Sequence, residues 1–370
     1  MRYLLAVLAL TSLALLREFL PSLPSSSHGT PRTLHPTLVA PRPFYAPDGR
    51  ALYTSCTADE LLASLKTAQI RPDGASRFPN FTTPEDVTLR PLEWSFGFGG
   101  IEGGKVCELP KVFSPQEACE LLSAFGGVYS TGDSFSRHFH SALLMLLRGR
   151  IDGAIRDYRE TDDCRGDRLF DDGKLCRQRI VTDTDADEPV CGGAASLMFL
   201  QTYRPDAASF STFHAWRSRL PRRLQLYSPL YLTGLGSHFD FDTSPLVPTY
   251  FDELFSSLSH SFPAAFNLFL GPHKPGANQP KIFVNRQGPD KVRAFKDLVP
   301  LLLREREEER EWYRGGVRYV DMYEMSDGAT SFDGVHYSRQ INLEKVQIVL
   351  NLLDILWGQV VAAGGMVVLE

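Results

Sequence analysis

The feature that most constrains the fold is an alternation of short apolar runs with longer helical segments after residue 127. The runs are rich in β-branched and aromatic residues and too short to form helices, so they indicate buried strands. Strands are predicted at 127–130, 197–203, 230–235, 281–285 and 317–322. Helices are predicted at 114–125, 136–148, 250–260, 290–313 (bent near Pro300) and 342–357. Strands that alternate with helices favour an α/β fold with a parallel sheet.

The N-terminus carries an export signal. An apolar run extends from Leu4 to Leu16 and is closed by Arg17 and Glu18. That length suits the hydrophobic region of a signal peptide better than a bilayer span of about 20 residues. A cleaved signal and a short type II signal anchor both remain open. A buried N-terminal helix is disfavoured, because a Pro- and Ser-rich segment follows directly.

Two further features indicate that the chain enters the secretory pathway. Asn80-Phe81-Thr82 is a glycosylation sequon. The even number of cysteines allows up to three disulfides, although the spacing does not assign the pairs. The cysteines are Cys56, Cys107, Cys119, Cys164, Cys176 and Cys191. No Cys-x-x-Cys pair occurs, so a zinc site is not predicted.

Composition and charge limit the partners. Hydrophobic residues make up 43% of the 370 residues and the net charge is −5. A large core can therefore be buried, and the chain lacks the basic surface that nucleic-acid binding needs. The acidic stretch 162–187 has no periodicity and is interpreted as a surface insertion. A metal-binding acidic loop is the alternative, which no calcium-loop spacing supports. The expected segments are a signal or anchor at 1–20, a stalk at 21–50, an extension at 51–105, a catalytic domain at 106–358 and a tail at 359–370.

The first candidate for chemistry is the tripeptide Gly132-Asp133-Ser134, which lies where the first strand meets a helix. A serine there stands at the carboxyl edge of the sheet, where open α/β folds bind ligands. Its backbone N–H lies at a helix N-terminus and can face an oxyanion. Gly132 allows the tight turn. The alternative is that Asp133 or Ser134 only caps the helix.

The second candidate is Asp333-x-x-His336, between the last strand and the last helix. An aspartate at that spacing can accept the Nδ1 proton of the histidine and leave Nε2 to take a serine proton. Either motif alone is common by chance. Their combined placement, after the first and the last strand, favours a Ser134–His336–Asp333 triad over a pair of solvated loops.

Other residues are candidates for support. His238, in the loop after the third strand, can stabilise an oxyanion or be an ordinary loop histidine, and Gly192 and Gly193 are further amide candidates. His138 and His140 are rejected as a metal pair, because an i, i+2 spacing turns them to different helix faces.

These motifs resemble those of the SGNH/GDSL hydrolase superfamily. Arg137, the Gly-x-His-Phe that begins at Gly236, and the Asp-Gly-x-His-Tyr that begins at Asp333 are similar to the PC-esterase clan. That clan includes trichome-birefringence-like and capsule O-acetyltransferase-like enzymes and the neurexophilin and PC-esterase-domain proteins. The resemblance covers residues 106–358. Where secreted SGNH esterases carry Gly-x-Asn, this chain has His238 in place of the asparagine.

The resemblance implies a three-layer α/β/α sandwich with a five-stranded parallel sheet, and an enzyme that moves acetyl groups onto glycan hydroxyls in the Golgi lumen. Ser134 would be acylated, His336 would act as base and then acid, and Asp333 would orient it. Arg137 would hold the acyl donor or shape the turn. The donor would be acetyl-CoA or another acetyl ester, with no metal or organic cofactor and a membrane contact only through an uncleaved N-terminus. Hydrolysis by a lumenal or secreted esterase and a non-catalytic glycan-binding protein are the alternatives.

Overall fold

The computed structural model describes residues 57–65, 68–69, 97–98, 112–150, 152–157, 164–170, 175–185, 188–227, 229–261, 266–309, 317–327, 329 and 331–362. The chain divides into two units, Met1–Pro41, which lies outside the described residues, and Arg42–Glu370. The predicted signal or anchor, the stalk and the Asn80 sequon lie outside the described residues. All that follows concerns the second unit.

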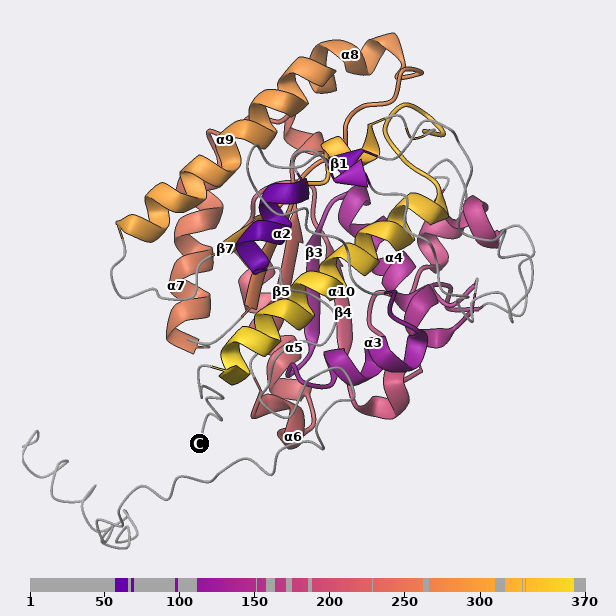
Figure 1. Ribbon diagram of the computed structural model, residues 1–370, viewed down its shortest axis with the longest axis vertical. Helices are drawn as coiled ribbons and strands as arrows, with labels where there is room; N and C mark the ends of the chain where they lie inside the picture. Colours follow the sequence, from indigo (N-terminus) through magenta and orange to yellow (C-terminus); the bar gives the residue numbers. More distant parts are fainter. Residues whose placement is uncertain are drawn as a thin grey trace, which may run out of the picture. The chain divides into compact units, whose positions relative to one another are not determined.

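The second unit contains a sheet of five parallel strands in the order β4-β3-β5-β6-β7 (Figure 1). Its strands are β3 (Val128–Gly132), β4 (Leu197–Gln201), β5 (Leu230–Gly234), β6 (Phe266–Leu270) and β7 (Val317–Val320). A separate antiparallel pair joins β1 (Ala68–Gln69) to β2 (Gly97–Phe98). The five-stranded parallel sheet confirms the predicted fold class. Because all five strands run the same way, their carboxyl ends meet at one edge, and chemistry carried by the following loops can converge there.

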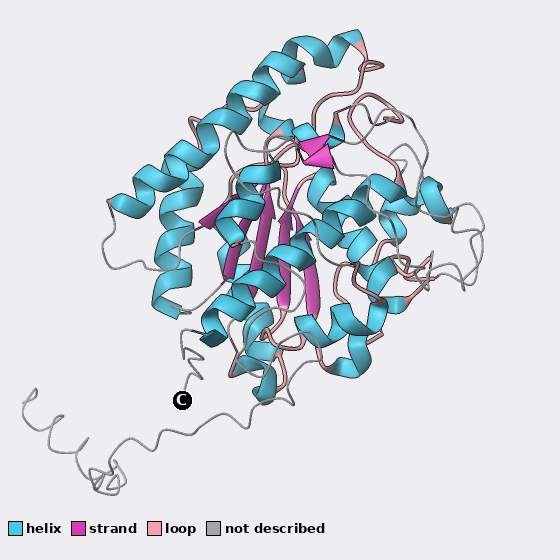
Figure 2. Cartoon of the chain, in the orientation of Figure 1, coloured by secondary structure: helices cyan, strands magenta, loops and turns pink. Residues whose placement is uncertain are grey.

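Helices cover both faces of this sheet (Figure 2). The described helices are α2 (Ala58–Leu65), α3 (Pro115–Leu122), α4 (Ser134–Arg148), α5 (Ala208–Arg219), α6 (Arg222–Gln225), α7 (Asp252–Ser261), α8 (Lys281–Gln287), α9 (Pro289–Glu308) and α10 (Arg339–Ala362). Among the described helices, none is both long and apolar enough to cross a bilayer.

Each strand sends alternate side chains into two separate cores. Val128 of β3 and Leu232 of β5 pack with α2, α3, α4 and α10, which lie in front of the sheet in Figure 1. Tyr129, Tyr231 and Phe269 point the other way and pack with α5, α7 and α9. The rings of Tyr129 and Tyr231 stack with their centroids 5.4 Å apart. One layer of helices therefore rests on an aliphatic face and the other on an aromatic face.

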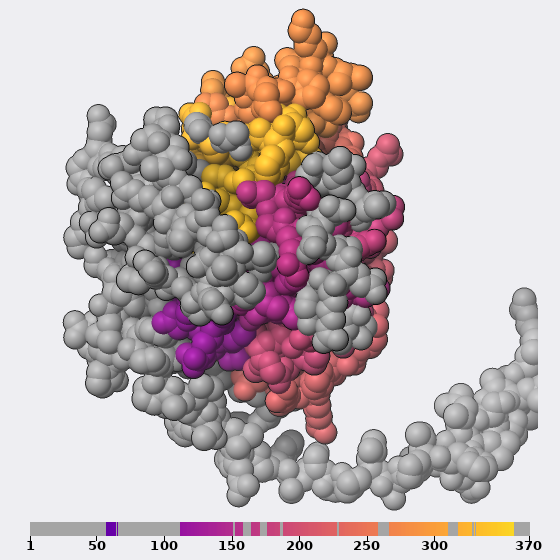
Figure 3. Space-filling view, turned by 90° about the vertical axis from the view of Figure 1, so that its right-hand side faces the viewer, coloured from indigo at the N-terminus to yellow at the C-terminus, as the bar shows by residue number. Residues whose placement is uncertain are grey.

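One predicted strand is wrong. Residues 281–285 form part of α8, and the fourth strand of the sheet is β6, which was not predicted. The run Ile282-Phe283-Val284 has the composition of a strand, but Pro280 precedes it at the helix N-cap and all three side chains are exposed. Figure 3 shows α8 and α9, in orange, beside the yellow segment that leads to α10. Composition alone cannot distinguish a short exposed helix from a buried strand.

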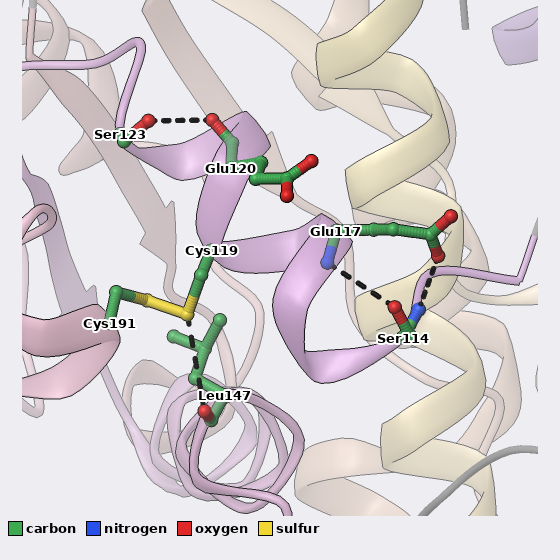
Figure 4. Close-up of a disulfide and its surroundings, with 7 residues drawn as sticks. All are labelled: Ser114, Glu117, Cys119, Glu120, Ser123, Leu147 and Cys191. Carbon is green, nitrogen blue, oxygen red and sulfur yellow. Dashed lines mark hydrogen bonds between the residues drawn. A yellow bond between two sulfur atoms is a disulfide. The ribbon is translucent and has the colours of Figure 1, made fainter. Parts of the chain in front are cut away.

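Helix α3 begins as predicted and is tied to the sheet by a disulfide. Ser114 accepts a hydrogen bond from the Glu117 backbone N–H, and the Glu117 carboxylate accepts one from the Ser114 N–H at 2.8 Å (Figure 4). In the next turn, Cys119 is bonded to Cys191, which lies just before β4. The bond joins two segments that are 72 residues apart in the chain.

The described parts of the acidic stretch are more than a surface insertion. Leu169, Phe170, Ile180 and Val181 are buried in the aliphatic core between α4 and β4. A second disulfide, Cys164–Cys176, closes a loop there with a separation of 12 residues. Cys56 and Cys107 lie outside the described residues. Two disulfides indicate an extracellular or lumenal protein.

Removal of the Cys119–Cys191 disulfide should destabilise the protein more than removal of Cys164–Cys176. The longer loop constrains the unfolded chain more strongly, by about 1.5 kcal/mol in the loop-entropy account once the inner bond is allowed for. The comparison is between the variants Cys119→Ala/Cys191→Ala and Cys164→Ala/Cys176→Ala in urea unfolding. An equal loss of unfolding free energy in both would show that loop length does not govern the effect.

Candidate active site

The turn that carries Ser134 depends on a close approach between β3 and β5. Gly132 ends β3 with φ at +145°, and a Cβ there would lie 2.0 Å from the Gly234 carbonyl oxygen. That carbonyl accepts hydrogen bonds from the Asp133 N–H at 3.2 Å and from Ser136 Oγ at 3.0 Å. The chain therefore turns from strand to helix without space for a side chain at Gly132, and Ser134 becomes the first residue of α4.

Asp133 builds the turn rather than reacting. Its carboxylate accepts hydrogen bonds from the Phe135 N–H at 3.0 Å, as the N-cap of α4, and from Ser237 Oγ at 2.6 Å. The Ser237 N–H adds a third bond at 3.2 Å. Burial raises the pKa of Asp133 above its ordinary value, against the lowering effect of the Ser237 hydrogen bonds and the His238 charge. Asp133 thus joins the Ser134 turn to the loop after β5.

The loop that carries Asp333 and His336 is a second tight turn. The Asp333 carboxylate accepts the Val335 N–H at 2.9 Å and the His336 N–H at 2.7 Å. Gly334 between them has φ at +83°, and a Cβ there would lie 2.0 Å from the Gln279 Cα. Ser331 Oγ donates to the His336 carbonyl at 2.8 Å and closes the loop. The backbone therefore holds the aspartate and the histidine facing each other.

Two hydrogen bonds link the side chains of Ser134, His336 and Asp333. His336 Nε2 lies 2.8 Å from Ser134 Oγ, although the two residues are 202 positions apart, and His336 Nδ1 lies 2.7 Å from Asp333 Oδ2. Ser134 and His336 are buried, and the Asp333 side chain is 47% exposed. With a proton on Nδ1, this order lets Nε2 withdraw the serine proton while Asp333 stabilises the imidazolium.

The environment of Asp333 keeps it ionised. Burial raises its pKa, but the hydrogen bond from His336, the His336 charge and the two backbone N–H groups outweigh burial and lower the pKa to about 2. Asp333 is therefore an anion at neutral pH.

Two loops lie at the same edge of the sheet as Ser134. His238, after β5, is exposed, and its ring lies edge-on to the exposed ring of Tyr203, after β4, with centroids 4.4 Å apart. Gly236 lies in the same loop as His238, and the Ser237 N–H is committed to Asp133. Gly192 and Gly193 precede β4, at the opposite edge of the sheet from Ser134. They cannot contribute amides to an oxyanion site there.

Arg137 is buried beneath the turn. The exposed fraction of the residue is 1%. When the Gln201 amide is oriented with its oxygen toward Arg137, Arg137 Nη1 donates a hydrogen bond to that oxygen at 2.8 Å. The same oxygen accepts from Arg177 at 2.9 Å and from the Tyr203 hydroxyl at 2.8 Å. Burial favours shaping the turn over contact with an acyl donor.

His138 and His140 point to different surroundings, as predicted. The His138 ring lies 5.0 Å from the His336 ring, whereas His140 stacks on Phe199 at 5.5 Å. Burial lowers the pKa of His140 to about 3. Within the described residues, no cluster of histidine, cysteine and carboxylate side chains could hold a metal ion.

Sequence reasoning did not identify Ser237, Tyr203, His273 or Lys345 as parts of the site. Ser237 and Tyr203 follow strands β5 and β4, so their position at the carboxyl edge was available as a signal. His273 and Lys345 belong to a loop and a helix of ordinary composition, and only tertiary packing brings the two into contact.

No family model and no curated protein matches the sequence. Among solved structures, the chain is similar to Est24, a carbohydrate acetylesterase from Sinorhizobium meliloti. The two are 13% identical, the TM-score is 0.32, and the match covers 65% of this chain and 99% of Est24. The order and direction of the strands establish the α/β fold, and the hydrogen bonds above establish the geometry of the site.

Replacement of Asp333 by asparagine should destabilise the protein in a pH-dependent way. Because the pKa of Asp333 is lowered from 3.8 to about 2 on folding, its stabilising effect is complete above about pH 5 and is lost as the pH falls through 2. The free energy of unfolding of Asp333→Asn should therefore lie below that of wild type at pH 7, and the difference should shrink steadily as the pH falls from about 5 to below 2. A difference that stays constant over this range would contradict the lowered pKa.

Proposed function

We propose that the protein is an acyltransferase of the secretory pathway, which transfers acetyl groups to glycan hydroxyls through an acyl-Ser134 intermediate. The observation that carries this proposal is the hydrogen-bonded series of Ser134, His336 and Asp333 at the carboxyl edge of the sheet. Such a series on a strand-to-helix turn supports nucleophilic attack on an ester carbonyl.

In the first half-reaction, Ser134 Oγ forms a bond to the acyl carbon while His336 Nε2 takes the hydroxyl proton. The Ser134 N–H, at the N-terminus of the 15-residue helix α4, faces the developing oxyanion. His238 or the Gly236 backbone supplies a second donor. As the tetrahedral intermediate collapses, the bond to the leaving group breaks, and His336 returns the proton to it. Acetyl-CoA or another acetyl ester serves as donor.

The second half-reaction reverses these roles. His336 Nε2 takes a proton from a glycan hydroxyl, the hydroxyl oxygen attacks the acyl carbon, and Ser134 recovers its proton as the ester bond to the enzyme breaks. No step requires a metal or an organic cofactor. Asp333 stays ionised throughout and stabilises the imidazolium twice in each cycle.

The aromatic pair of Tyr203 and His238 supports a carbohydrate acceptor. Tyr203 is 41% exposed, yet Gln201, Arg177 and His238 contact its ring or hydroxyl and hold it in place. The negative face of such a ring attracts the weakly positive C–H groups of a sugar. Arg177 and His238 beside it offer donors to sugar hydroxyls.

Hydrolysis is the second candidate reaction, and one observation favours it. The side chain of Asp333 is 47% exposed, so solvent reaches the aspartate end of the triad, next to the buried His336 and Ser134. A water molecule in place of the glycan hydroxyl would make the protein a carbohydrate esterase with the same residues in the same roles.

The proposed secretory-pathway enzyme would reside in the Golgi as a type II membrane protein or be secreted. Mass spectrometry of the mature N-terminus distinguishes these two locations.

Ser134→Ala should lower the rate of acetyl release or transfer by at least about 1,000-fold, because the attacking oxygen is removed. The assay uses an acetyl ester with and without an acceptor oligosaccharide. Acetylated sugar indicates transfer, and acetate alone indicates hydrolysis. The matched control is Ser141→Ala, a buried serine on the same helix that bonds the Arg137 carbonyl at 2.8 Å. Activity in Ser134→Ala equal to wild type would refute the nucleophile, and inactivity of folded wild type would favour a binding protein.

Tyr203→Ala should raise KM for an acetylated oligosaccharide by about tenfold, since an exposed ring contact is worth about 1.4 kcal/mol. The rate with 4-nitrophenyl acetate should not change, because that ester needs no sugar contact. Leu226→Ala, an exposed apolar residue near the opposite edge of the sheet, is the control. If KM for the oligosaccharide is unaffected, Tyr203 does not contact the glycan.

A further inference from the structure

A buried pair of basic residues lies behind the triad, and the proposed reaction uses neither. Lys345 belongs to α10 and His273 follows β6; their exposed fractions are 2% and 5%. Lys345 Nζ contacts His273 Nε2 directly. A cavity of about 10 Å³ beside them is lined by α4, the ends of β5 and β6, and the loop after β7. A buried lysine is costly unless it is paired and hydrogen-bonded.

The His273 ring contacts the neighbours of both reacting residues. It lies 4.5 Å from the ring of Phe135, which follows Ser134 in the chain, and 5.3 Å from the ring of Tyr337, which follows His336. The Tyr337 hydroxyl also donates to the carbonyl of Lys274, next to His273. The His273 imidazole therefore lies between the turn that carries Ser134 and the loop that carries His336, here called the histidine loop (residues 331–337).

Lys345 holds this imidazole and the histidine loop together. Besides His273, its Nζ donates to Asn342 Oδ1 at 3.2 Å. Asn342 Nδ2 in turn donates to the Tyr337 carbonyl at 3.0 Å. Lys345 Nζ also lies 5.8 Å from the centre of the Tyr337 ring. The start of α10 is thus connected through Lys345 to the residues on either side of the Ser134–His336 bond.

The surroundings of Lys345 and His273 favour the neutral forms of both side chains. The ionisable groups that face it are His138 from α4, His336 and Tyr337 from the histidine loop, and Glu344 from α10. Burial lowers the pKa of Lys345 and of His273 well below their ordinary values, and the nearby Lys345, His138 and His336 charges lower that of His273 further. A pair that binds protons poorly adds little repulsion when His336 becomes an imidazolium.

We propose that Lys345 and His273 are positioning residues, whose contact holds the Ser134 turn and the His336 loop at the separation at which a proton passes between them. This inference rests on the proposed function, because it assigns the pair to the same Ser134–His336 step. It adds a set of contacts that connects α10, the loop after β6 and α4 next to the Ser134–His336 hydrogen bond.

The test is Lys345→Met, which keeps the length of the side chain and removes the amine. Because misplacement of a catalytic group by about 1 Å can cost 100-fold, kcat per titrated active site should fall at least about tenfold, with KM unchanged. His273→Gln keeps an acceptor for Lys345 but removes the ring between Phe135 and Tyr337. It should likewise lower kcat per active site and leave KM unchanged. A merely structural pair would lower stability and leave kcat per active site at the wild-type value.

Gln347→Met is the matched control. Gln347 is buried on the same helix and bonds the Phe113 backbone N–H at 2.7 Å and carbonyl at 2.9 Å. Its loss should lower the free energy of unfolding while kcat per active site stays at the wild-type value. If Lys345→Met and His273→Gln behave like Gln347→Met, the proposal is overturned.

A second measurement separates this inference from the proposed function. A fluorophosphonate labels a serine that a histidine activates, whatever ester the enzyme uses, so the labelling rate of Ser134 reports the Ser134–His336 contact directly. Slower labelling in Lys345→Met than in wild type and Gln347→Met supports the proposal, even if no acetyl ester is consumed and the proposed function fails. Labelling of Lys345→Met at the wild-type rate overturns it. A wild-type Ser134 that is not labelled at all overturns both.

Discussion

The site depends on the contact between the backbones of β3 and β5 where both strands end. At this point the Gly234 carbonyl receives the Asp133 N–H and the Ser136 hydroxyl, and no atom fits between Gly132 and that oxygen. The contact fixes the start of α4, and through it the direction of Ser134. The Asp133 carboxylate then connects the same turn to Ser237. A methyl group at Gly132 would separate the strands and disturb the helix N-terminus, the nucleophile and the loop after β5 together.

Much of the fold and the core of the site could be predicted from the sequence, for identifiable reasons. Four of the five strands were located because a short buried run bounded by turn residues is a local signal. The turn of Ser134 and the loop of His336 were placed at one edge because parallel strands end together. The hydrogen bonds between Ser134, His336 and Asp333 agree with that placement. The capping box at Ser114 is equally local, and the structure contains it.

What could not be predicted depends on packing between distant segments. The run Ile282-Phe283-Val284 has the composition of a strand, but only its exposure shows that it belongs to a helix, and β6 was missed beside it. His273 and Lys345 are 72 positions apart, and nothing local to either marks the contact. The burial of Arg137 is of the same kind, since the sequence left open whether this arginine holds an acyl donor or shapes the turn. Each of these outcomes is set by which surfaces meet.

The two aspartates of the site show how environment divides labour between identical side chains. Asp133 is fully buried, receives three hydrogen bonds from neutral donors and has a raised pKa. Asp333 is half exposed and faces His336, and its pKa is lowered to about 2. Only Asp333 offers a charge that grows more favourable as an imidazolium forms beside it. In the proposed reaction, one carboxylate would therefore hold the Ser134 turn in place, and the other would stabilise the positive charge that His336 gains with the Ser134 proton.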